Sequence, residues 1–68
     1  MNTKHLSEQE INALLDGDIP SIETKPWRHG TRRVFVTEID DKMWKFEIPW
    51  DNNEGPMIYG GVDAVQVE

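Results

Sequence analysis

The chain of 68 residues can form one small domain, and a domain of this size buries only about 60% of the surface that its unfolded chain exposes. Thirteen acidic and seven basic residues give a formal net charge of -6, which disfavours general nucleic-acid binding because phosphate contacts need positive charge. Without cysteine the chain can form neither a disulfide framework nor a thiolate metal site, and no apolar run approaches the ~20 residues of a membrane span. The N-terminus also lacks the apolar segment of a signal peptide, so we expect a cytoplasmic protein that does not associate with membranes.

The first predicted element is a helix over 6-17, and two local signals mark its start. Ser7 suits the N-cap position, and Glu10 completes a capping box because its side chain can accept a hydrogen bond from the Ser7 backbone N–H. Leu6 and Ile11 have the spacing of a hydrophobic staple. These signals predict that the helix begins directly after Ser7.

The body and the end of this helix are predicted from its apolar stripe. Ile11, Leu14 and Leu15 follow the i, i+3, i+4 spacing of one helix face. Gly17 is expected to end the helix in a left-handed conformation. A helix of about three turns is marginal alone in water, so we expect the stripe to pack against the rest of the chain.

The same segment, residues 6-18, contains Leu-Ser, Glu-Ile, Ala-Leu-Leu and Gly-Asp in that order. In this pattern it resembles the N-terminal segment of the flagellar motor switch protein, which docks the chemotaxis response regulator. The family's segment folds as a short helix on its partner, so the resemblance implies a helix that binds another protein. It covers thirteen of the 68 residues, and nothing after Asp18 resembles the switch protein. The alternative is a capped helix that covers this chain's own sheet.

Residues 18-30 are predicted to form an extended connector. Pro20, Pro26 and Gly30 interrupt regular structure there, because proline restricts the residue before it and glycine favours turns. Trp27 stands out as a large aromatic residue within a basic segment. It is interpreted either as an exposed anchor for a partner, since Trp and Arg are enriched at binding hot spots, or as a side chain that lies over a sheet edge.

A hairpin is predicted from the stretch 32-50, which holds most of the apolar bulk. Its second strand is the clearer one, because Trp44, Phe46, Ile48 and Trp50 recur at period two. This alternation predicts a strand with one strongly apolar face. The rest of the chain is expected to cover that face.

The register of the hairpin depends on its loop. A tip at Asp40-Asp41 pairs Phe35 with Phe46, and a four-residue loop over 39-42 keeps that register. The core face would then carry Phe35, Ile39, Trp44, Phe46 and Ile48. A three-residue loop would instead turn Val34 and Val36 to the core. We prefer the first register, in which the opposite face is partly exposed and carries Val34, Val36, Met43, Lys45 and Glu47.

After the hairpin, the sequence predicts a loop and a third strand. Pro49 ends the hairpin ladder or lies at a sheet edge, because it donates no hydrogen bond. The acidic and amide residues of the loop 51-56 do not match an EF-hand, since Gly55 comes one position early and Val62 occupies the bidentate position. The third strand is predicted over 57-67, with a break at Gly60-Gly61.

Together these elements predict an α+β fold in a single small domain over 1-68. One short N-terminal helix over 6-17 packs on a three-stranded antiparallel sheet over 32-67, and the segment 18-30 connects the two. The apolar helix face would meet the core face of the hairpin and Val65 of the third strand.

No residue pattern predicts an enzyme, a cofactor or a metal site. His5 and His29 lack metal-ligand spacing with any run of carboxylates, and Ser7 is explained by its role as a helix cap. Neither a glycine-rich phosphate loop nor a helix with paired catalytic carboxylates is present. We therefore expect a non-enzymatic protein.

Small size, acidic balance and polarised charge favour a protein-binding module, of the inhibitor or adaptor type that phages and mobile elements encode. Its partner would be a host or cellular protein, and a homodimer is the other protein assembly that the sequence permits. The predicted partner-binding residues combine the basic segment with the exposed sheet face: Trp27, Arg28, Arg32, Arg33, Val36 and Met43.

Two alternatives involve nucleic acid. The segment from Lys25 to Arg33 contains four of the seven basic residues together with Trp27, so it could contact nucleic acid through stacking and positive charge. The acidic surface could instead imitate nucleic acid and block a DNA-binding protein.

Overall fold

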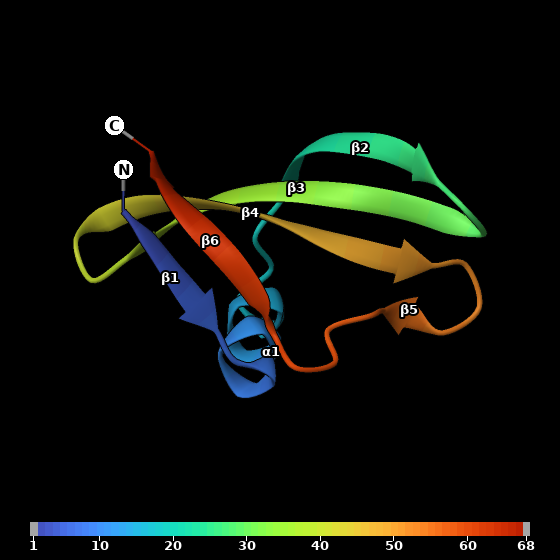
Figure 1. Cartoon of the computed structure of the whole chain (residues 1–68), viewed down its shortest axis with the longest axis horizontal. Coiled ribbons are helices and arrows are strands. Elements are labelled where there is room, and N and C mark those ends of the chain that lie inside the picture. Colours follow the sequence, from blue (N-terminus) through green and yellow to red (C-terminus); the bar gives the residue numbers. More distant parts are fainter. Residues whose placement is uncertain (1, 68) are drawn as a thin grey trace.

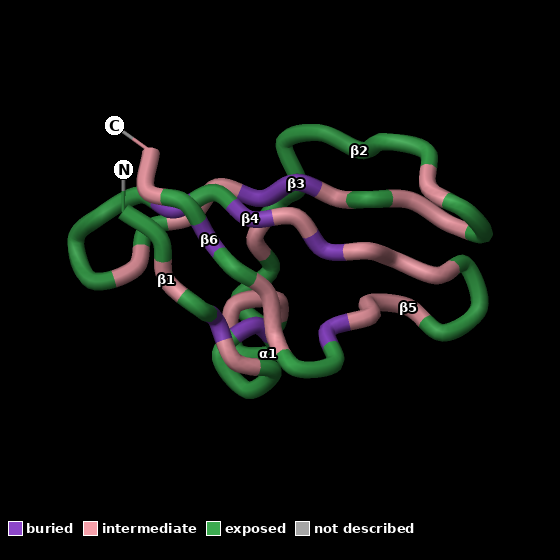
Figure 2. Tube along the Cα trace, viewed as in Figure 1, coloured by how far each residue is buried: buried purple, intermediate pink, exposed green. Residues whose placement is uncertain are grey.

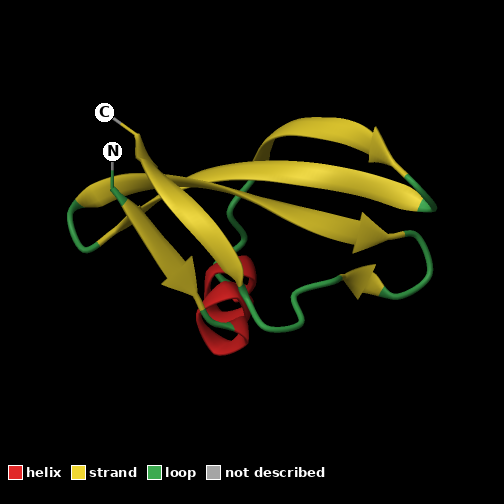
Figure 3. Cartoon of the chain, in the orientation of Figure 1, coloured by secondary structure: helices red, strands yellow, loops and turns green. Residues whose placement is uncertain are grey.

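The computed structural model describes residues 2–67, which form six strands and one helix (Figure 1). In chain order these are β1 (Thr3–Leu6), α1 (Glu8–Asp16), β2 (Ser21–Trp27), β3 (Gly30–Ile39), β4 (Lys42–Asp51), β5 (Gly55–Pro56) and β6 (Val62–Val67). The helix lies against one side of a twisted sheet (Figure 3). No helix within the described range has the length and apolar character needed to cross a membrane.

The strands form one antiparallel sheet in the order β1-β6-β4-β3-β2. The short β5 also pairs with β4, at the end of β4 that β6 does not reach. The α+β class is therefore confirmed, whereas the prediction of a three-stranded sheet is wrong. The sequence pattern predicts β3, β4 and β6, although the third strand begins at Val62 and not at residue 57, and it does not predict β1, β2 or β5.

The predicted connector 18-30 is wrong for most of its length, because it contains β2, which pairs with β3. β2 is an edge strand, and it is exposed along almost its whole length (Figure 2). It therefore lacks the apolar alternation that identifies a half-buried strand. Pro26 fits this position because proline within a sheet is found on edge strands, where its missing N–H can face solvent and removes no ladder hydrogen bond. Trp27 pairs with Gly30 and closes the β2–β3 hairpin.

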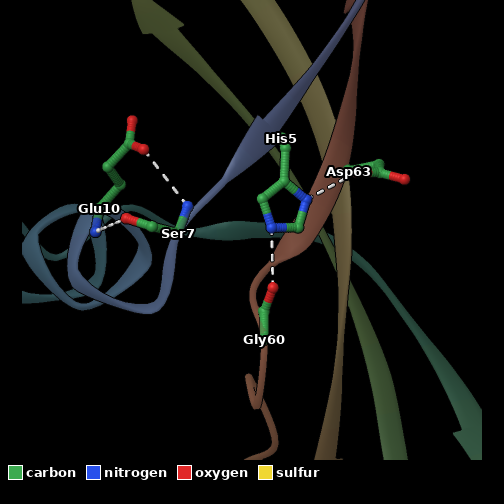
Figure 4. Close-up of polar contacts among 5 residues, drawn as sticks. All are labelled: His5, Ser7, Glu10, Gly60 and Asp63. Atoms are coloured by element: carbon green, nitrogen blue, oxygen red, sulfur yellow. Dashed lines mark hydrogen bonds and ion pairs between the residues drawn. The ribbon is translucent and has the colours of Figure 1, made fainter.

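The start of α1 agrees with the prediction, whereas its end does not. The Glu10 N–H donates to Ser7 Oγ at 3.2 Å, and the Ser7 N–H donates to Glu10 Oε1 at 3.3 Å (Figure 4). Gly17 has a φ of -75°, so the predicted left-handed stop at this glycine is wrong. The left-handed residue is Asp18, with a φ of 60° and an N–H that donates to the Leu15 carbonyl at 3.0 Å.

The hairpin of β3 and β4 has the predicted register. Phe35 pairs with Phe46, and their rings stack with centroids 5.5 Å apart. The loop is the two-residue turn Asp40-Asp41, with positive φ values of 53° and 67°. Such a turn matches the twist of the flanking strands but places aspartate in a conformation that glycine or asparagine adopts more easily.

One sheet face, which we call the core face, packs against α1 and the chain before β6. The buried cluster on this side consists of Leu6, Ile11, Phe35, Trp44, Phe46, Ile48, Ile58 and Ala64. Ile39, Leu14 and Leu15 are half-buried and pack against it. The predicted core face and the predicted role of the helix stripe are thus confirmed.

The opposite face of the sheet, which we call the outer face, is less open than predicted. Val34 has 0% exposure, although it points away from the core face. Val34 pairs with Glu23 on β2 and with Glu47 on β4. Glu47 also forms an ion pair with Lys25 at 3.1 Å, and this contact links β2 to β4 across β3. The unpredicted strand β2 therefore encloses Val34, while the part of the outer face farther from β2 stays accessible.

Candidate functional site

A tryptophan flanked by two arginines lies at the end of the β2–β3 hairpin. The guanidinium carbon of Arg28 is 5.3 Å from the centroid of the Trp27 ring, and that of Arg32 is 5.8 Å from the same centroid. Both distances fall within the range of cation–π contacts. Trp27 itself is half-buried, while both arginines are exposed. We call these three residues the Trp27 cluster.

The turn that carries the Trp27 cluster is held against the neighbouring loop. The Asn52 N–H donates to the His29 carbonyl at 3.2 Å. Gly30 pairs with Asp51, and a Cβ atom at Gly30 would lie 1.8 Å from the carbonyl oxygen of Trp50, so only glycine allows the strands to approach this closely. The contacts fix the position from which the cluster faces solvent.

The β4–β5 loop that supports this turn is ordered by Asp51. Its carboxylate accepts hydrogen bonds from the N–H groups of Asn53 and Glu54, at 2.8 and 3.1 Å. These two bonds favour the charged form and hold the pKa of Asp51 below its usual range. A negative charge therefore lies beside the β2–β3 turn.

Arg33, which the sequence groups with Arg32, lies on the other face of the sheet. Successive residues of a strand point to opposite faces, so Arg33 shares the core face with Trp50. Its guanidinium carbon is 4.1 Å from the centroid of the Trp50 ring. The six predicted partner-binding residues therefore do not form a single surface.

Among the described residues, no carboxylate forms an ion pair with the arginines at this end of the sheet. Within residues 2–67 the ion pairs closer than 4.0 Å are Lys4–Asp40, His5–Asp63 and Lys25–Glu47. Arg28, Arg32 and Arg33 take part in none of them, although the chain has thirteen acidic residues. Their guanidinium groups lie within cation–π distance of indole rings instead, and such a contact leaves guanidinium N–H groups available for an external acceptor.

Val36 and Met43, the remaining predicted residues, lie on the outer face together with Val65. Val36 and Val65 flank Lys45 in one cross-strand row, and Met43 precedes Lys45 by two positions on the same face. Met43 is 42% exposed and Val65 is 36% exposed, while Val36 is half-buried. We call these three residues the outer-face patch.

A hollow of about 330 Å³ opens beside this patch. It is lined by Lys45, Phe46, Glu47, Asp63 and Val65. It forms because β6 pairs with β4 only from Met43 to Lys45, and the two strands separate beyond that point. The prediction that Val65 meets the helix is wrong, because Val65 pairs with Lys45 and therefore points to the outer face.

His5 forms a polar contact that the sequence does not reveal (Figure 4). Its Nδ1 is 2.9 Å from Asp63 Oδ1, and its Nε2 is 2.7 Å from the Gly60 carbonyl oxygen. Both neighbours are acceptors, so the imidazolium form with two N–H donors fits best. The bond to Asp63, followed by that to Gly60, raises the pKa of His5 above 6.5. This contact fastens β1 to β6 and to the turn before β6.

The segment 6-18, which resembles the docking segment of the flagellar switch protein, contributes to this chain's own core. Leu6 and Ile11 have no exposed surface, and Leu14 and Leu15 are half-buried. No group of three or more metal-ligating side chains is assembled within the described part of the chain. Comparison with models of known families, with curated proteins and with solved structures finds no match for this chain.

Proposed function

We propose that the chain is a small protein-binding module, an inhibitor or adaptor of the type that phages and mobile elements encode, and that a host protein docks on its outer face. The observation that carries this proposal is the outer-face patch. The core face is covered by α1 and by the chain before β6, whereas the outer face presents Met43 and Val65 to solvent. Apolar side chains grouped on an uncovered surface are typical of protein interfaces.

The composition of this surface supports a protein partner further. Lys45 lies between Val36 and Val65, and the hollow beside it offers space for a side chain of the partner. Apolar contacts surrounded by charged groups are the usual arrangement of a specific interface. The small size and acidic balance of the chain fit an inhibitor or adaptor.

Site-specific photo-cross-linking tests this proposal. A benzophenone amino acid is introduced in place of Met43 and, as a control, in place of Tyr59, which is 79% exposed in the turn before β6. After irradiation in the cells that make the protein, the probe at position 43 should give one dominant adduct with a cellular protein, and the probe at position 59 should not.

Two outcomes would contradict the proposal. The first is a folded chain that gives no adduct from position 43, and the second is an equal set of adducts from both positions. A cross-linked species with twice the mass of the chain would replace the host protein with a second copy of the chain.

A further inference from the structure

We propose that the Trp27 cluster binds carboxylate side chains, and that the partner docked on the outer face therefore presents an acidic segment at the β2–β3 end of the sheet. This inference rests on the proposed function and specifies the chemistry of the partner. It follows from the arrangement of Trp27, Arg28 and Arg32 relative to the outer-face patch.

The Trp27 cluster and the outer-face patch lie on the same side of the sheet. Arg32 and Val36 are both on β3, and even spacing along a strand keeps side chains on one face. Four residues of strand separate them by about 13 Å. A single extended segment of a partner can therefore reach both, with its apolar part over the patch and its acidic part over the cluster.

The arginines of the cluster are prepared for carboxylates. Arg28 and Arg32 contact the same indole ring, so their guanidinium carbons are no farther apart than the sum of 5.3 and 5.8 Å. A guanidinium group held near a ring face by a cation–π contact still has N–H groups that can form a bidentate contact with a carboxylate. Lys25, in contrast, is already paired with Glu47 at 3.1 Å. Within residues 2–67, Arg28, Arg32 and Lys45 on this face take part in no ion pair, and the two arginines supply the positive charge at the β2–β3 end.

An acidic protein segment fits this site better than nucleic acid. The Trp27 ring is half-buried and is already contacted by both guanidinium groups, so it offers little open surface on which a base could stack. Two adjacent carboxylates need only the two arginines.

Titration with the peptide hexaglutamate at about 0.15 M salt, where charges more than about 8 Å apart are largely screened, tests the inference. Proton–nitrogen correlation spectra resolve the indole N–H of each tryptophan, and the signal of Trp27 should shift while that of Trp50 stays in place. Arg32→Gln should weaken binding by at least about tenfold. Arg33→Gln removes the same charge one residue away but on the other face, and it should change the affinity by less than about twofold.

The fold of each variant is checked by circular dichroism. If Arg32→Gln does not fold, Arg32→Lys replaces it, because lysine keeps the charge but loses the bidentate geometry, and it should weaken binding to an intermediate degree. Absence of a Trp27 shift at millimolar peptide, or equal losses from the changes at Arg32 and Arg33, would overturn the inference. Tighter binding of single-stranded oligothymidylate than of hexaglutamate, with the same dependence on Arg32, would assign the cluster to nucleic acid instead.

The test is independent of the cross-linking experiment at Met43. An adduct from position 43, with no shift of the Trp27 indole signal on addition of hexaglutamate, would leave the protein-binding function in place. It would remove the preference for an acidic segment of the partner. Hexaglutamate binding without an adduct would overturn docking on the outer face.

Discussion

Replacing Ile11 with alanine should strongly destabilise the protein, because this side chain joins α1 to the sheet. Ile11 has 0% exposure and belongs to the buried cluster. The change removes three carbon atoms, and at about 0.8 kcal/mol each the lost transfer free energy is about 2.4 kcal/mol. The unfilled cavity raises the total cost to ~3–4 kcal/mol. A domain of this length has a free energy of unfolding of roughly 3–10 kcal/mol, so Ile11→Ala should remove a large part of it.

Thermal unfolding followed by circular dichroism measures this effect. We expect Ile11→Ala to lower the Tm by at least about 10 °C. Asn12→Ala is the matched control, because Asn12 is the exposed neighbour on the same helix and its replacement should change stability by less than ~0.5 kcal/mol. Equal Tm values for the two variants would refute the packing of α1 on the sheet. That result would leave the segment free to dock on a partner, as its resemblance to the flagellar switch protein implies.

Three further predictions concern the turns and the N-terminal strand. Gly30→Ala should cost ~1–3 kcal/mol in a thermal melt, because the added Cβ would lie 1.8 Å from the carbonyl oxygen of Trp50; an unchanged Tm would contradict this close approach. Asp41→Gly should raise the free energy of unfolding measured in urea by about 0.5 kcal/mol, because Asp41 has a φ of 67°; a lower midpoint would show that the turn does not strain this residue. His5→Gln should destabilise the chain at acidic pH, and the loss should shrink as pH rises. The pKa of His5 is raised in the folded chain, so its stabilising contribution is complete below the unfolded value of 6.5 and disappears as pH passes the folded value. A difference between wild type and His5→Gln that is constant with pH would contradict the contacts with Asp63 and Gly60.

The parts of the fold that the sequence predicts are those set by neighbouring residues. The cap of Ser7 and Glu10 depends on three residues of spacing, and the register of the β3–β4 hairpin depends on the alternation of Phe46 with its neighbours. The helix cap and the hairpin register both depend on residues that are close in the sequence, so they can be predicted from a single sequence. The predicted left-handed stop is wrong by one residue, because Asp18 adopts the left-handed conformation that was expected of Gly17. Aspartate can adopt this conformation as a single residue, so glycine is not required there.

The missed strands lack such local patterns. β1 has only four residues, and its place in the sheet depends on pairing with β6 and on the contact of His5 with Asp63, which is 58 positions away in the sequence. β2 is exposed on both faces, and the prolines before it and within it, Pro20 and Pro26, suggest a connector. These omissions explain why Val34 was expected to be accessible, since β2 encloses it.

The candidate site could be predicted in part for the same reason. Trp27, Arg28 and Arg32 are close in sequence, and the short β2–β3 hairpin keeps them together in space. The separation of Arg32 from Arg33 follows from strand alternation, because both residues lie within the predicted hairpin stretch 32-50. Val65 joins Val36 and Met43 only through the pairing of β6 with β4, which the sequence does not determine.

The central claim is that a protein partner docks on the outer face, and the affinity of Met43→Glu for the cross-linked partner tests it most directly. Ile22→Glu is the matched control, because Ile22 is 60% exposed on the edge strand β2 and its replacement makes the same change in charge. With both variants shown to be folded by circular dichroism, Met43→Glu should lose at least about tenfold in affinity and Ile22→Glu less than about twofold. Retained affinity in Met43→Glu, or an equal loss in Ile22→Glu, would contradict the claim.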